Sequence, residues 1–265
     1  MTNSICAIAM AALFTTVGLK APVMEKTKSW NKNQVIAHRG AWKKKSLPEN
    51  SIASLNEAIN LGCYGSEFDV QMTSDSVLVV NHDDDFLGIT IASHTYNELL
   101  AKKLSNGESI PTLEAYLKAG KKQKGTKLIL ELKPSKISAE RDLQMTRKAV
   151  AMVKKLGAAA WVDYISFSYG ICEEILALQP GVKVAYLNGD ASLERLKAAG
   201  FYGADYHFSV YKNGDWFTQS KAMGLTLNAW TVNTAADMNW LLDQHIEFIT
   251  TNEPELLFDL LKSRK

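Results

Sequence analysis

From residue 34 to the end of the chain, short runs of β-branched and aliphatic residues alternate with segments whose apolar residues recur at helical spacing. The segment from Ile52 to Ile59 has this spacing, and Gly62 then ends it. Strands are predicted at residues 34–38, 66–70, 128–132, 163–167, 182–186, 204–208, 226–231 and 247–250, and a last helix begins at Pro254. Alternating strands and helices predict a parallel sheet with both faces covered.

Eight strands, each followed by a helix, are the number that closes a (β/α)8 TIM barrel. A doubly wound open sheet is the alternative fold. That fold normally has a glycine-rich turn after its first strand, and no G-x-G-x-x-G follows any predicted strand here. The sequence therefore predicts an α/β fold of the TIM-barrel type, with one domain over residues 34–263.

One further apolar run, residues 77–80, follows the second predicted strand after the polar stretch 73–76. A crossover between two parallel strands needs about a dozen residues, so this short connection predicts a β-hairpin. A turn centred between residues 74 and 75 would place Glu67 opposite His82. A carboxylate and an imidazole would then share one face of the hairpin.

Acidic residues occupy strand positions where a carboxylate is expensive to bury. Glu67 and Asp69 are two residues apart in the second predicted strand, so their side chains project from the same face. Glu131 lies in the third predicted strand. Because Ca²⁺ and Mg²⁺ bind carboxylate oxygens, the three acids predict a divalent-cation site. An ordinary amphipathic hairpin, and a salt bridge from Glu131 to Lys133, are the alternative interpretations.

Polar and ionisable residues gather at the C-terminal ends of the predicted strands, which is the end of a barrel that holds active sites. Arg39 and Lys133 provide positive charge there that suits a phosphate group. His38 and His82 suit proton removal and proton donation near neutral pH. Ligation of Zn²⁺ or Fe is the alternative role for these histidines, although neither occurs in H-x-H or H-E-x-x-H spacing.

Composition adds few constraints to this picture. With 30 basic and 28 acidic residues the net charge is +2, so nothing favours nucleic acid or an anionic membrane as a partner. The three cysteines, Cys6, Cys63 and Cys172, form neither a metal-binding cluster nor a disulfide framework. Cys63 and Cys172 are predicted to be small buried hydrophobic residues.

The beginning of the chain differs from the rest. The run from Ile5 to Leu19 is apolar, rich in small residues and too short to span a bilayer, although no Lys or Arg precedes it. It predicts a signal peptide over residues 1–21, with a buried helix as the alternative. The mature protein would then be periplasmic or secreted, with the cytoplasm as the alternative location, and no stable membrane insertion is expected.

Eight segments resemble, in order, the motifs of the glycerophosphodiester phosphodiesterase family: AHRGAW (37–42), LPENS (47–51), GSEFDVQMTSD (65–75), VNHD (80–83), IPTLEAYL (110–117), LELK (130–133), NAWTVNT (228–234) and FITTNEPELL (248–257). The resemblance extends from about Val35 to Leu261. H-R-G, P-E-N, E-x-D and H-D in this order are specific in combination. The resemblance implies a (β/α) barrel related to the phosphoinositide phospholipase C group.

The same resemblance implies roles for residues at the strand ends. His38 and His82 would be the catalytic acid–base pair, and Glu67, Asp69 and Glu131 would hold the divalent cation, either Ca²⁺ or Mg²⁺.

Further residues match substrate and metal positions of that family. Arg39 and Lys133 would face the phosphate, and Glu49 would orient or supplement the metal shell. Trp230 would contact the glycerol end of the substrate, and His207 would line the pocket. A helix N-terminal acid and an aromatic that only packs the barrel mouth are the alternatives for Glu49 and Trp230.

The expected activity is metal-dependent hydrolysis of glycerophosphodiesters to glycerol 3-phosphate and an alcohol. The alternatives are a related diesterase acting on glycerophosphoinositol or lysophospholipids, and a non-catalytic phosphodiester-binding protein. The segment 83–110 is short, so the sizeable insertion of some relatives is absent and the identity of the alcohol stays open. The metal, the first nucleophile (water or a substrate hydroxyl) and the oligomeric state stay open as well.

Overall fold

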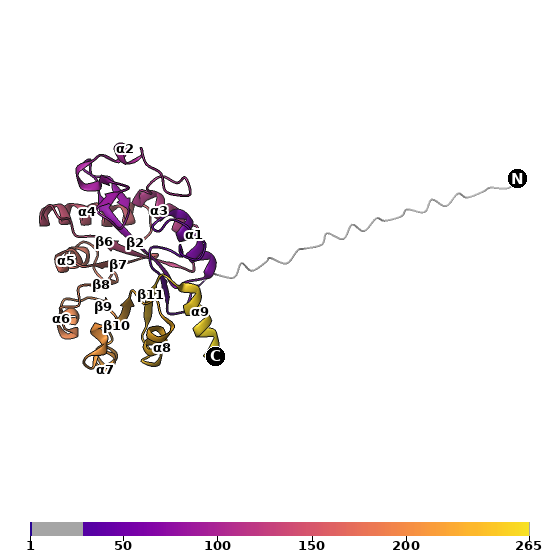
Figure 1. The fold of residues 1–265 in the computed structure, drawn as a ribbon, viewed down its shortest axis with the longest axis vertical. Helices are drawn as coiled ribbons and strands as arrows, with labels where there is room; N and C mark the ends of the chain where they lie inside the picture. The colour runs from indigo at the N-terminus through magenta and orange to yellow at the C-terminus, as the bar shows by residue number, and fades with distance from the viewer. Residues whose placement is uncertain (2–28, 265) are drawn as a thin grey trace.

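Eight parallel strands form a closed barrel in this computed structural model, which describes residue 1 and residues 29–264 (Figure 1). The strands are β1 (Val35–Ala37), β2 (Gly65–Met72), β6 (Lys127–Leu132), β7 (Val162–Ser166), β8 (Val184–Tyr186), β9 (Gly203–His207), β10 (Thr226–Trp230) and β11 (Phe248–Thr251). Pairing of β1 with both β2 and β11 closes the ring. The predicted strands and the predicted TIM barrel are confirmed. Beyond residue 1, the predicted signal peptide lies outside the described residues, as does Cys6.

Helices surround the barrel as a ring in Figure 1. They are α1 (Ile52–Leu61), α3 (Leu113–Gly120), α4 (Ala139–Lys155), α5 (Tyr169–Leu178), α6 (Leu193–Ala198), α7 (Trp216–Met223), α8 (Ala235–Asp243) and α9 (Pro254–Ser263). Most begin after a serine or threonine whose hydroxyl accepts a hydrogen bond from a first-turn N–H, as Ser51 does from Ser54. None of the helices in the described part of the chain has the length and apolarity needed to cross a membrane.

Two apolar layers support the barrel. The larger one fills the space between strands and helices, and it contains Cys63 and Cys172, both buried as predicted. A smaller cluster inside the barrel is formed by Ile36, Ile129, Ile165 and Leu187. These side chains fill the barrel interior with packed apolar groups, so the polar residues at the strand ends are held by a rigid core.

The predicted hairpin is present, but its predicted pairing of Glu67 with His82 is wrong. Strand β3 (Leu78–Val80) runs antiparallel to β2, and Val70 lies opposite Val80. The register is therefore one residue away from the predicted one. In addition, the ladder ends before the histidine, which lies in the loop that follows.

The turn geometry explains the shift in register. The N–H of Thr73 donates to the carbonyl of Val77 at 3.0 Å, so the loop contains three residues, 74–76. Ser76 adopts a left-handed conformation with φ of 63°. Three-residue hairpin loops place such a residue at their end, and an odd number of loop residues moves every cross-strand pair by one position.

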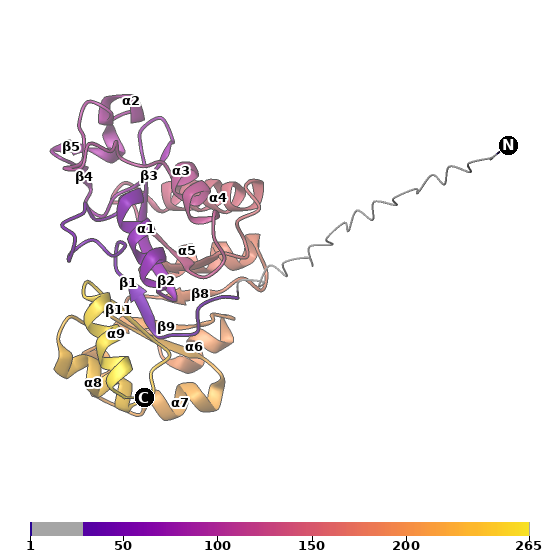
Figure 2. The ribbon, with the colours of Figure 1, turned by 90° about the vertical axis from the view of Figure 1, so that its right-hand side faces the viewer.

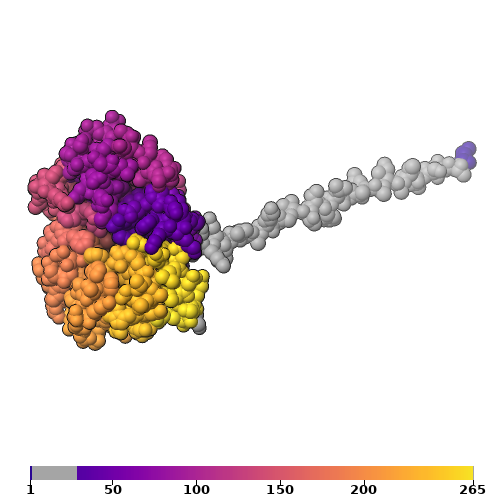
Figure 3. Space-filling model, in the orientation of Figure 1, coloured from indigo at the N-terminus to yellow at the C-terminus, as the bar shows by residue number. Residues whose placement is uncertain are grey.

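Residues 83–110 fold as a small unit at one end of the molecule, which the pattern of apolar residues did not predict. It contains β4 (Asp85–Phe86), β5 (Ile89–Thr90), the 3-10 helix η1 (Ile91–Ser93) and α2 (Tyr96–Leu99). Figure 2 shows these elements above the barrel, and in Figure 3 their side chains form the top of the molecule. Val79, Phe86, Ile91, Leu99 and Ile110 give this unit an apolar core of its own.

Candidate active site

Three buried carboxylates stand together on the neighbouring strands β2 and β6. Glu67, Asp69 and Glu131 are 2%, 1% and 7% exposed. The two strands are parallel neighbours, and Asp69 lies directly opposite Glu131. One oxygen from each acid can be chosen so that all three lie within 4.8 Å of one another. The structure thus brings together the three acids that the strand spacing selected, while their role as metal ligands stays a prediction.

The positive charge around these acids offsets the burial of Asp69 but not that of Glu67 and Glu131. Burial, followed by the charges of Asp69 and Glu131, raises the pKa of Glu67 well above its usual range. Burial and the charge of Asp69 raise the pKa of Glu131 to about 8. Burial also opposes the charge of Asp69, but Lys133, with help from His82, lowers its pKa. Such a site, rich in acceptors and short of positive charge, is what a hard divalent cation occupies.

Two cationic side chains flank the three acids. The Nζ of Lys133 lies 3.3 Å from Asp69 Oδ1 and 3.5 Å from Glu131 Oε1, so the salt bridge considered as an alternative for Glu131 is present within the cluster. The Nη1 of Arg39 donates to Glu49 Oε1 at 2.8 Å. The structure places Glu49 against this guanidinium and not in the three-acid cluster. Glu49 would therefore act on the predicted metal site only indirectly, by holding Arg39.

His38 presents one ring nitrogen to the acids. Its Nδ1 bonds to Asn252 Oδ1 at 2.7 Å, which places a proton on Nδ1, and its Nε2 lies 4.0 Å from Glu67 Oε2. Burial and the charge of Arg39 lower the pKa of His38 to about 4. The imidazole is thus neutral near pH 7, and its Nε2 is able to accept a proton.

The second histidine lies on a braced loop. The Nδ1 of His82 is 2.7 Å from Asp83 Oδ1. The Nε2 of Gln71 donates to the carbonyl oxygens of Asn81 and His82 at 3.0 and 3.1 Å, which ties the loop to the end of β2. His38 and His82 line one cavity of about 110 Å³, which Glu67 also lines. The two histidines and the acids therefore face a common space.

Aromatic side chains form the opposite wall of this cavity. Trp230 lines it and packs edge-on against Phe167 with ring centroids 5.4 Å apart. His207, predicted to line the pocket, is not among the residues that line this cavity. Because His207 is the register partner of Trp230 on the neighbouring strand, its ring packs against the indole at 5.4 Å instead. It supports the aromatic wall from outside the cavity.

Sequence reasoning missed two buried polar residues of the site. Asp205 lines the cavity, burial raises its pKa to about 7, and its Oδ1 has no hydrogen-bond partner. The rule that side chains two residues apart on a strand share a face, which selected Glu67 and Asp69, would also have selected Asp205, two residues before His207. Asn50, from the P-E-N motif, donates to Asp69 Oδ2 at 2.8 Å and accepts from the Asp69 N–H at 3.1 Å.

The H-R-G motif forms a strained turn between β1 and the acids. Arg39 and Gly40 both have positive φ, 56° and 81°, and the N–H of Arg39 donates to Glu67 Oε2 at 2.8 Å. A Cβ on Gly40 would lie 2.6 Å from the backbone carbon of Ser54 in α1. The glycine therefore lets the helix approach the turn that holds Arg39 in place.

Gly40→Ala should destabilise the protein more than Gly107→Ala. Gly107 also has positive φ (85°), but a Cβ at this position would have no atom within 4 Å, so its replacement costs only about 1–2 kcal/mol of backbone strain. The clash with Ser54 should add about 1–3 kcal/mol at Gly40. Urea unfolding of the two variants measures the difference. Equal losses of stability would show that α1 tolerates the extra methyl group.

Comparison with known proteins adds independent information to this geometry. The family model described as "Glycerophosphoryl diester phosphodiesterase family" matches residues 38–256. A curated glycerophosphodiester phosphodiesterase from Caldanaerobacter subterraneus is 26% identical over 249 residues, which cover 87% of this chain and 98% of the relative.

Solved structures are similar over the same length. A glycerophosphodiester phosphodiesterase from Parabacteroides distasonis is 46% identical with a TM-score of 0.85, covering 89% of this chain and 99% of that one. A phosphodiesterase from Oleispira antarctica, solved in complex with the product sn-glycerol 3-phosphate, is 26% identical with a TM-score of 0.73, covering 87% and 97%. With the barrel, the three acids and the two histidines in place, the chain belongs to the glycerophosphoryl diester phosphodiesterase family.

Proposed function

We propose that this protein is a metal-dependent phosphodiesterase that hydrolyses glycerophosphodiesters to glycerol 3-phosphate and an alcohol by acid–base catalysis. The observation that carries the proposal is that His38 and His82 line one cavity together with Glu67 and Glu131. Membership of the family supports the reaction class, and the product bound to the Oleispira antarctica relative supports the substrate class.

The three acids fit a divalent cation. Glu67 Oε1 is buried and has no hydrogen-bond partner, so a lone pair in the middle of the cluster is available to an ion. An all-oxygen donor set of this kind suits Ca²⁺ or Mg²⁺. Glu67, Asp69 and Glu131 would hold the ion, which when bound would polarise a phosphoryl oxygen and offset the charge that develops there.

The two histidines have different partners, and we assign their roles from this difference: a neutral amide oxygen holds His38, whereas a carboxylate, which favours the protonated imidazolium, holds His82. His38 has its proton on Nδ1, held by Asn252, and a free Nε2, so it removes the proton of the attacking hydroxyl group. His82 is oriented through Nδ1 by Asp83, and it protonates the oxygen of the departing alcohol. One proton is accepted and one is donated, so the pair returns to its starting state once the two histidines exchange protons with water.

Substrate orientation falls to the remaining lining residues. Arg39 is held by Glu49 and Lys133 by Asp69, so both cations lie at fixed positions for phosphate oxygens. Trp230 donates from its Nε1 to the carbonyl oxygen of Asp205 at 2.8 Å, which fixes the indole as a wall for the carbon atoms of glycerol.

Release of glycerol 3-phosphate from glycerophosphocholine, glycerophosphoethanolamine and glycerophosphoinositol, measured with and without chelator, tests this function. We expect release that disappears with chelator and returns with Ca²⁺ or Mg²⁺. Quenched time courses also identify the nucleophile, because attack by a vicinal substrate hydroxyl would produce a cyclic phosphate first. Activity that survives both the chelator and His82→Ala would contradict the proposed mechanism.

A further inference from the structure

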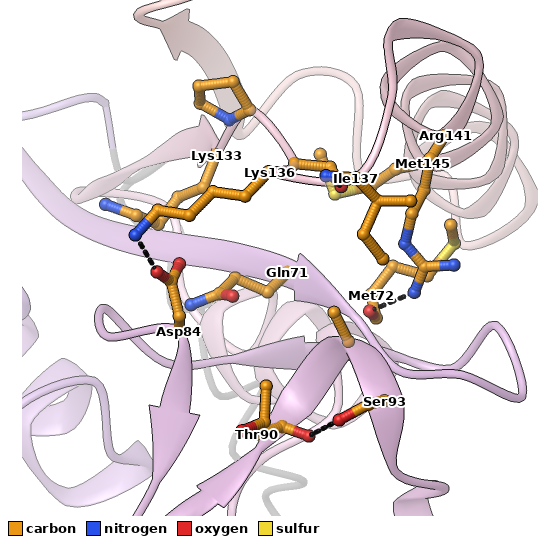
Figure 4. A pocket seen from close by; sticks show the side chains of 13 residues that line it. Gln71, Met72, Asp84, Thr90, Ser93, Lys133, Lys136, Ile137, Arg141 and Met145 are labelled. Atoms are coloured by element: carbon orange, nitrogen blue, oxygen red, sulfur yellow. Dashed lines mark hydrogen bonds and ion pairs between the residues drawn. The ribbon is translucent and has the colours of Figure 1, made fainter.

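A second cavity, of about 280 Å³, adjoins the catalytic one (Figure 4). Lys133 lines both cavities. The second cavity lies between the end of β2, the loop from β6 to α4, the first turns of α4, and the unit formed by residues 83–110. Gln71, which braces the loop of His82, forms part of its wall. The cavity therefore begins beside the histidine that is proposed to protonate the departing alcohol.

The lining of this cavity offers mostly carbon and sulfur to a ligand. Met72 and Met145 are 4% and 2% exposed, so they back the wall of the cavity on the side where Figure 4 also shows Ile137. Ala92 and Pro134 add further apolar surface. Flexible thioethers next to aliphatic groups adapt to hydrocarbon of varied shape.

Several polar groups of the lining are already bonded within the protein. The Nη2 of Arg141 donates to the carbonyl oxygens of Met72 and Thr73 at 2.7 and 2.8 Å. Lys136 extends to Asp84 and forms an ion pair with it, as Figure 4 shows. A polyol in this cavity would have to compete with these bonds, whereas a hydrocarbon chain would leave them intact.

The charges of the lining disfavour a cationic ligand. Lys133, Lys136 and Arg141 line the cavity together with one carboxylate, that of Asp84. The head of choline or ethanolamine would meet more positive than negative charge there. Ile137, in addition, is 59% exposed on the cavity wall, so a bound chain would cover apolar surface that otherwise faces water.

We infer that this cavity binds the departing alcohol and selects alcohols with an uncharged hydrocarbon chain. The inference rests on the proposed function. Since glycerol is assigned to the wall of Trp230, the other ester oxygen lies towards His82, and the carbon chain attached to it enters the second cavity past Lys133. Burial of each methylene group then strengthens binding of the transition state.

Esters of glycerol 3-phosphate with methanol, 1-butanol, 1-hexanol and choline test the inference. We expect kcat/KM to rise by up to about fourfold per methylene group along the alkyl series, and the choline ester to remain below the butyl ester. Ile137→Ser should flatten this rise. Leu178→Ser is the matched control, because Leu178 is also an exposed aliphatic residue (44%) but lies on α5 and outside this cavity.

Two results would overturn the inference while leaving the proposed function intact. One is an equal kcat/KM for all alkyl esters, with glycerol 3-phosphate released from each. The other is a rise with chain length that Ile137→Ser does not change. Failure to cleave any of the four esters would instead contradict the proposed function itself, and with it the role of this cavity.

A binding measurement supports or rejects the hydrocarbon site without turnover. The ¹³C-methyl resonances of Met72 and Met145 should shift when 1-hexanol is added, and Met145→Leu assigns one of them. Unchanged resonances at 1-hexanol concentrations that inhibit cleavage of the hexyl ester would place the chain elsewhere.

Discussion

Removal of the divalent cation by a chelator should lower the rate of glycerol 3-phosphate release by about 10²- to 10³-fold, and Glu67→Gln should have the same effect with the fold retained. Glu67 is buried close to the other two acids and has an oxygen without a partner. Its amide analogue keeps the volume but loses the charge that an ion requires. Adding Ca²⁺ or Mg²⁺ back should restore the wild type and identify the preferred ion, but it should not restore the variant.

Glu67→Gln, which should lower the activity, should raise the stability of the metal-free protein. Burial and the charges of Asp69 and Glu131 raise the pKa of Glu67. A carboxyl group whose pKa is raised by folding destabilises the folded state increasingly as the pH rises above its pKa in the unfolded chain, and the glutamine resembles the protonated form. In chelator, therefore, Glu67→Gln should melt at a higher temperature than the wild type. Added cation should raise the Tm of the wild type only.

Glu114→Gln provides the control for this measurement. Glu114 is an exposed acid on α3 that pairs with Lys118 at 2.6 Å, so its replacement should neither raise the Tm in chelator nor alter the response to the cation. If the cation raised the Tm of Glu67→Gln as much as that of the wild type, the ion would bind at another site.

The sequence contained enough information to locate the acids because strand geometry is local. Side chains two residues apart on a strand share a face, and parallel strands end at the same side of a barrel. These two rules place Glu67, Asp69 and Glu131 together without any knowledge of helix packing. The predicted hairpin register was wrong because the true register depends on the left-handed conformation of Ser76. Glycine or asparagine at this position would have indicated such a conformation, but serine does not.

These local rules do not predict contacts between residues that are far apart in the sequence. Asn252 bonds to His38 across 214 positions because closure of the barrel brings β11 beside β1. His207 stands at a strand end as predicted, but its ring packs against the indole of Trp230, its partner on the neighbouring strand, and its contact with the substrate stays a prediction. A pattern along one strand does not contain such contacts between neighbouring strands.

His38→Ala and His82→Ala should each reduce kcat by about 10²- to 10⁴-fold, with a much smaller change in KM, since each removes a proton transfer of the chemical step. The double variant should lose little more than either single one, because the two histidines act on the same reaction. His207→Ala is the matched control. Its ring supports Trp230 from outside the cavity, so we expect less than about a tenfold effect, mainly on KM.

An ester with 4-nitrophenol separates the two roles. The 4-nitrophenolate ion leaves without being protonated, so its glycerol 3-phosphate ester should recover most of the activity lost in His82→Ala. The loss in His38→Ala should persist, because the attacking hydroxyl group still has to be deprotonated by the Nε2 that Asn252 leaves free. Rescue of His38→Ala in place of His82→Ala would reverse the assignment, since the residue whose absence an acidic leaving group compensates is the one that supplies the proton.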